Sequence, residues 1–135
     1  ASLATMNKLQ REPIIATMTK QGEKIITFLR DVITKFGATN ILSVSGHPVW
    51  SFLLIKDAEP YTQWQIKTLF MQEMLARGIL TLGTHNMSYS HSDHDLDKLF
   101  DAYTEVIPLL VHAIKEKTLE KRLHCQTLES LFKVR

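Results

Sequence analysis

The 135-residue chain has 44% hydrophobic residues, 22% charged residues and a net charge of +2, and these values are typical of a single globular domain. The weak, mixed charge excludes the clustered basic face of a nucleic-acid-binding protein, and no apolar run reaches the roughly eighteen residues of a membrane span. The single cysteine, Cys125, excludes an internal disulfide framework and favours a cytoplasmic location.

Helical spacing dominates the first part of the chain. Ser2–Arg11 has helical composition, with Leu3, Met6 and Leu9 on one side. Because the sequence opens in this way, we expect it to be a piece of a longer protein. Pro13 suits the first turn of a second helix, where its missing N–H leaves no bond unmade.

Gly37 lies just past Phe36, where a left-handed residue is expected to end the second helix. Beyond it, the spacing of apolar and turn residues predicts strands at 41–45 and 49–56, a helix at 61–77, strands at 79–82 and 86–90, and a helix at 93–117. Pro108 should kink the last helix, and the tail after Leu119 fits either helix or strand. The order predicts an α+β fold in which helices pack on a small antiparallel or mixed sheet of about four strands.

The run GTHNMSYSHSDHDLDK, residues 83–98, concentrates histidines and aspartates. Metal ligands on a helix share a face at i, i+3 or i+4, and only His94 and Asp97 satisfy that spacing, without a known metal motif around them. By contrast, Ser92 is well placed as a helix N-cap with Asp95 at N3, a variant of the capping box. We therefore interpret the run as a helix start and predict no metal site.

Other conspicuous side chains also have structural interpretations. Trp50 and Trp64 occupy predicted strand and helix positions and are expected in the core. Cys125 beside His124 is not a catalytic pair by adjacency alone, because sequence neighbours point in different directions. We expect a partly buried, inert thiol there, and no catalytic residue in the chain.

One long stretch resembles a known family. FMQEMLARGILTLGTHNMSYSHSDHDLDKLFDAYTEVIPLL, residues 70–110, resembles the C-terminal small domain of class III pyridoxal-phosphate (PLP) aminotransferases. The nearest branch is that of glutamate-1-semialdehyde aminomutase. ASLATMNKLQREPIIATMTKQGEKIITFLRDVITKFG, with Gly22 and Glu23, resembles the segment after the large domain of that family. GHPVWSFLLI resembles the strand pair that follows, so that the likeness covers nearly all of residues 1–135.

The resemblance implies the C-terminal domain of a fold-type I PLP enzyme. In that family the large domain holds the Schiff-base lysine and the phosphate contacts, and it would lie upstream of Ala1. PLP is therefore expected in the intact parent enzyme and not in this chain by itself, which is predicted to be inactive. The expected partners are the chain's own large domain, a second subunit of a homodimer, and a small amino or keto substrate.

By position in the family, the loop Thr84, His85 and Asn86 lies nearest the substrate. We predict hydrogen bonds from His85 and Asn86 to the substrate; satisfaction of loop backbone groups is the alternative. Gly83 stands where aminomutase relatives have an acidic residue, and His91 stands where many class III enzymes have a carboxylate-binding arginine. These two departures argue against glutamate semialdehyde and against a simple α-amino acid as the substrate.

Two other functions remain open. The chain could be a stand-alone binding or dimerisation module that has lost the catalytic domain. A small metalloenzyme that uses His85, His91 and His94 is the third hypothesis, and it lacks a supporting motif.

Overall fold

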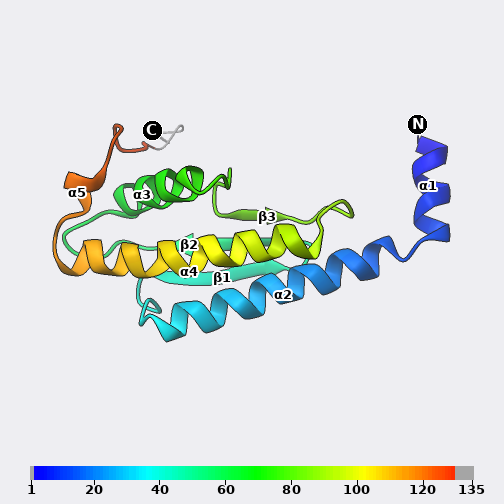
Figure 1. Cartoon of the computed structure of the whole chain (residues 1–135), viewed down its shortest axis with the longest axis horizontal. Helices are drawn as coiled ribbons and strands as arrows, with labels where there is room; N and C mark the ends of the chain where they lie inside the picture. Colours follow the sequence, from blue (N-terminus) through cyan, green and yellow to red (C-terminus); the bar gives the residue numbers. More distant parts are fainter. Residues whose placement is uncertain (1, 130–135) are drawn as a thin grey trace, which may run out of the picture.

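The computed structural model describes residues 2–129 of the chain, which form an α+β fold. Figure 1 shows its elements, which in chain order are α1 (Ser2–Arg11), α2 (Ile14–Lys35), β1 (Leu42–His47), β2 (Trp50–Ile55), α3 (Gln63–Ala76), β3 (Thr84–Asn86), α4 (Asp93–Lys115) and α5 (Leu119–Arg122). The predicted fold class is therefore confirmed, and so is the position of each long helix.

The described residues form one antiparallel sheet of three strands in the order β1-β2-β3. The prediction of about four strands is wrong for this part of the chain, because residues 79–82 do not pair with the sheet. Gly78 and Gly83, with φ of 77° and 85°, turn the chain at both ends of that segment. Leu80 and Leu82 are 86% and 62% exposed, and their apolar character had favoured a strand.

The last strand also begins earlier than predicted. Leu53 N donates to Gly83 O at 2.7 Å and Met87 N donates to Val49 O at 3.0 Å, and these two bonds frame β3. After Met87 the chain turns, with His91 N donating to Ser88 O at 3.1 Å. The predicted strand at 86–90 is thus mostly a turn, and Thr84–Asn86 is the strand in its place.

The core lies between the sheet and a layer of helices (Figure 1). Along β2, Ser51 and Leu53 are buried while Trp50 and Leu54 are exposed, which is the alternation of a sheet covered on one face. α2 packs on β1 and α3 on β2, and α4 packs between these two helices. Tyr103, from α4, is fully buried in this core.

Left-handed glycines end two of the helices. Gly37 has φ of 65° beyond the C-terminus of α2 and Gly78 has φ of 77° beyond α3, as left-handed residues that end helices do. α4 runs through Pro108 without interruption. α5 is one short helix in the tail, whose residues 130–135 lie outside the described part of the chain.

Gly22 allows α2 to approach the hairpin between β1 and β2 very closely. A Cβ atom built on Gly22 would lie 1.8 Å from the carbonyl oxygen of Pro48, which belongs to the hairpin backbone. No L side chain fits at that distance without moving the hairpin or the helix. The glycine therefore sets the distance between α2 and the sheet.

We expect Gly22→Ala to lower the free energy of unfolding by roughly 2 kcal/mol, although alanine is the better helix former by about 1 kcal/mol. Urea denaturation would measure the change, with Thr27→Ala on the exposed side of α2 as the matched control. A Gly22→Ala variant as stable as the wild type would show that the helix and the hairpin are not held this close.

Candidate functional site

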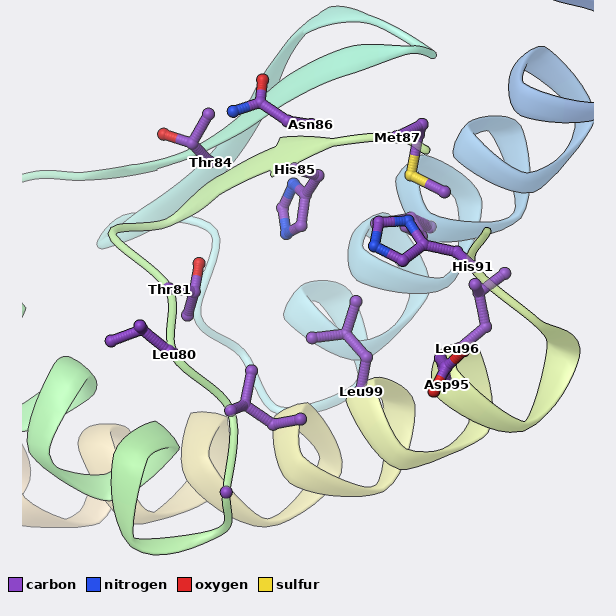
Figure 2. Close-up of a pocket in the computed structure, with 13 residues that line it drawn as sticks. Leu80, Thr81, Thr84, His85, Asn86, Met87, His91, Asp95, Leu96 and Leu99 are labelled. Atoms are coloured by element: carbon purple, nitrogen blue, oxygen red, sulfur yellow. The ribbon is translucent and has the colours of Figure 1, made fainter. Parts of the chain in front are cut away.

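A cavity of about 470 Å³ lies where β3, the segment after α3 and the first turns of α4 meet. Figure 2 shows its walls, with the side chains of His91, Leu96 and Leu99 on one side and Leu80 and Thr81 on another. Ile25 from α2 also contributes to it. The predicted substrate-side residues Thr84, His85 and Asn86 all border this cavity, so it is the candidate functional site.

Strand alternation separates the three predicted substrate-side residues. His85 is opposite the buried Ser51 and is itself only 6% exposed, on the helix-covered face of the sheet. Thr84 and Asn86 are opposite Phe52 and Trp50, and their side chains point to the other side of β3 (Figure 2). The three side chains therefore do not converge on one ligand.

His85 belongs to a buried polar chain that links two strands to α4. Its Nδ1 lies 3.1 Å from Ser51 Oγ, and its Nε2 lies 2.7 Å from the hydroxyl oxygen of Tyr103. A neutral imidazole satisfies both contacts, since one nitrogen donates and the other accepts. With both ring nitrogens engaged by protein, His85 has none left for a substrate.

Burial controls the protonation of His85 and Tyr103. Desolvation lowers the pKa of His85 from 6.5 to about 4, although a hydrogen bond with the Ser51 backbone opposes the shift. Desolvation also raises the pKa of the Tyr103 hydroxyl well above its ordinary value. Both side chains are thus neutral at physiological pH, which suits a structural polar link in a dry core.

The Ser51–His85 contact has the geometry of a nucleophile beside a base, but not the access that catalysis requires. Ser51 is 0% exposed, so a substrate carbon cannot reach its Oγ. Nothing in the sequence pattern identified Ser51 or Tyr103, because their contacts to His85 join residues 34 and 18 positions apart.

The histidine- and aspartate-rich run forms the predicted capping box. Asp95 N donates to Ser92 Oγ at 3.3 Å, and Ser92 N donates to Asp95 Oδ2 at 2.8 Å. These bonds from the Ser92 backbone and hydroxyl lower the pKa of Asp95. Asp93 forms an ion pair with Lys24 of α2 at 2.7 Å, which lowers its pKa too.

Among residues 2–129, no three histidine, cysteine or acidic side chains gather as a metal site. His85 faces the core, whereas His91 and His94 are exposed. The Nδ1 of His91 accepts a hydrogen bond from Ser88 N at 3.2 Å. These placements give the metalloenzyme hypothesis no support.

Three expectations about burial are wrong. Trp50 and Trp64 are 57% and 37% exposed instead of lying in the core. For Trp50 the reason is the alternation of side chains along a strand. The run VWSFLLI is apolar at almost every position, and because Ser51 and Leu53 lie on the covered face, Trp50 lies on the other. Cys125 is exposed instead of partly buried, because the chain has left α5 before reaching it.

The chain matches no family model, no curated protein and no solved structure. Within residues 2–129, no helix is both long enough and apolar enough to cross a bilayer.

The depressed pKa of His85 predicts a specific pH dependence. As the pH falls from 6.5 towards 4, the unfolded chain binds a proton at this residue and the folded chain does not, so that stability is lost in this window. Over that range we expect the unfolding free energy of the wild type to fall by roughly 3 kcal/mol more than that of His85→Gln. Parallel curves of unfolding free energy against pH for the two proteins would contradict the buried, neutral assignment.

The capping box predicts a second effect. Ser92→Ala should lower the free energy of unfolding by about 1 kcal/mol, because the Asp95 N–H at the start of α4 loses its acceptor and Asp95 Oδ2 loses the hydroxyl donor. Thermal and urea melts would measure it, with the nearby exposed Ser90→Ala as the control. If both variants melt alike, the helix does not depend on this cap.

Proposed function

We propose that this chain is the C-terminal small domain of a PLP-dependent class III aminotransferase or aminomutase of fold type I. In this proposal it packs on a large catalytic domain of the same polypeptide and covers one side of the substrate cleft. The parent enzyme is a cytoplasmic homodimer that acts on a small amino or keto substrate. The resemblance of residues 70–110 to that family is the basis of the proposal.

The observation that carries it furthest is the sheet face that no described helix covers. We call this the open face; it carries the outward side chains of Trp50, Phe52 and Leu54 on β2, with Thr84 and Asn86 on β3. Trp50 and Leu54 are 57% and 45% exposed. An apolar surface of this kind with a polar rim is typical of a contact with another domain, which is the role expected of a small domain.

The N-terminal helix supports the same interpretation. None of the residues of α1 is buried, and Leu3, Met6 and Leu9 are 76%, 57% and 42% exposed. An amphipathic helix this short gains most of its stability from packing of its apolar side. A contact with the large domain would supply that packing.

In this proposal the large domain, and not this chain, holds PLP. PLP chemistry requires a lysine whose amine is desolvated, so that it reacts in the neutral form. No lysine among residues 2–129 is buried, and Lys24 is held in an ion pair by Asp93. The proposal therefore assigns the cofactor and the catalytic lysine to the large domain.

In this proposal Thr84 and Asn86, and not His85, are the substrate-side residues. Thr84 and Asn86 face outwards from the sheet, beside Trp50, and can offer hydroxyl and amide groups to a substrate at the domain boundary. His85 lies behind them, in contact with Ser51 and Tyr103. Gly83, with φ of 85°, would place a Cβ 3.2 Å from the carbonyl oxygen of Leu53, so an acidic side chain fits poorly there. Because the aminomutase relatives have an acidic residue at this position, the proposal favours a substrate other than glutamate semialdehyde.

The competing function is a stand-alone binding or dimerisation module with the same fold. The open face would then bind a second copy or another protein. The two functions differ in one observable property, which is the length of the native polypeptide that contains this sequence.

An antibody against this chain would isolate the native protein, and borohydride reduction followed by peptide mapping would locate any PLP-bound lysine. We expect a polypeptide several times longer than 135 residues, with the pyridoxyl group on a lysine outside this sequence. The isolated chain, treated with PLP and borohydride, serves as the control and should acquire no adduct on one specific lysine. A native polypeptide of fragment size, or a specific adduct within these residues, would contradict the proposal.

A further inference from the structure

The hydrogen bonding of β3 leaves one of its edges unpaired. Residues that exchange bonds with β2 alternate along the strand, and the bonds at Gly83 and Met87 fix which ones they are. His85, between them, therefore bonds to Ser51 across the ladder. The N–H and C=O groups of Thr84 and Asn86 consequently point away from β2, along the free edge of the sheet.

This free edge forms one wall of the cavity of about 470 Å³. Thr84 and Asn86 border the cavity although their side chains point to the other side of the strand (Figure 2). Their contribution to the cavity wall is thus the backbone edge. We call this cavity, with the β3 edge as its wall, the edge groove.

The other walls of the edge groove are largely apolar. Leu96 and Leu99 of α4 and Ile79 and Leu80 of the segment after α3 line it. A strand that paired with Thr84 and Asn86 would direct alternate side chains towards these residues, because successive side chains of a strand point to opposite faces. The groove therefore offers backbone partners and an apolar wall for alternate side chains, the two elements of β-strand addition.

The charge at the groove selects among extended segments. Of the described residues that line it, Asp95 is the one carboxylate, and none is lysine or arginine. Asp95 accepts hydrogen bonds from the Ser92 backbone and hydroxyl through Oδ2, and His91 and His94 are the cationic side chains close enough to lower its pKa further. A cationic group at one end of the bound segment complements this carboxylate.

We propose that the edge groove binds an extended peptide segment as an added strand on β3, with alternating apolar side chains and a cationic residue at the end near Asp95. This site is distinct from the open face and does not depend on the proposed aminotransferase function. The short length of β3, three residues, limits the pairing to the backbone groups of Thr84 and Asn86.

The test uses the whole chain, labelled with ¹⁵N, and the probe acetyl-Arg-Val-Thr-Val-Thr-Val-amide together with its reversed sequence. We expect the amides of Thr84 and Asn86 to shift and their exchange with solvent to slow by about tenfold, because they gain hydrogen-bond partners. The amides of His85 and Met87, which already bond to β2, serve as the internal control. No change at Thr84 and Asn86, or shifts gathered on the open face, would overturn the proposal.

Two N-methylated versions of the probe that binds provide a control that leaves the protein unchanged. Methylation of alternate amide nitrogens blocks either the edge that pairs with β3 or the edge that faces solvent. We expect one version to bind as well as the parent peptide and the other to bind about tenfold more weakly. Equal affinities for the two versions would mean that the peptide does not add as a strand.

A separate experiment tests whether Asp95 binds the cationic residue of the peptide. Asp95→Asn keeps an acceptor oxygen for the Ser92 cap and removes the charge, so we expect it to weaken the arginine probe by about fivefold. A probe with norleucine in place of arginine should bind the wild type and this variant equally. If both probes lose the same affinity, the carboxylate does not select a cation and this part of the proposal is wrong.

Discussion

The register between β2 and β3 is the constraint on which the rest of this structure depends. By pairing Ser51 with His85, it turns His85 towards α4 and turns Thr84 and Asn86 outwards. A shift of β3 by one residue against β2 would turn Thr84 and Asn86 towards the helices and His85 outwards. The buried polar chain, the open face and the edge groove are thus three consequences of one pairing.

The contact between His85 and Tyr103 connects this register to the helix layer. This hydrogen bond joins β3 to α4 within the described core. If either group lost its partner, a buried polar group would be left unsatisfied and the fold would be destabilised. Because Ser51 and Tyr103 hold the ring from both sides, only one orientation of β3 satisfies all three groups. The hydrogen bonds of Ser51, His85 and Tyr103 therefore favour one register between β2 and β3, whereas the apolar residues of β2 could lie on either face of the sheet.

Local signals in the sequence predicted the parts of the fold that depend on neighbouring residues. Ser92 and Asp95 form the expected capping box, and Gly37 adopts the expected left-handed conformation, since each depends on one turn of chain. The strands were less predictable. Leu80 and Leu82 are as apolar as any strand residue, yet they lie outside the sheet, because pairing is decided by distant backbone groups.

The candidate site shows the same division between local and long-range information. The sequence singled out Thr84, His85 and Asn86 as a group, but strand alternation placed them on two faces. Ser51 and Tyr103 could not be predicted, because an isolated serine in a strand and a tyrosine in an amphipathic helix carry no sign of a partner 34 or 18 residues away. Likewise, the exposure of Trp50 followed from the alternation of side chains along β2 and not from the hydrophobicity of Trp50.

Hydroxyl-radical footprinting of Trp50 tests the central claim most directly, which is that the open face packs against the rest of a parent enzyme. The measurement compares oxidation of Trp50 in the isolated chain and in the native protein, with Trp64 on α3 as the reference. We expect Trp50 to react readily in the isolated chain and to be protected in the native protein, while the oxidation of Trp64 changes little. Equal oxidation of Trp50 in both would contradict it, because the open face would then remain exposed to solvent in the intact protein.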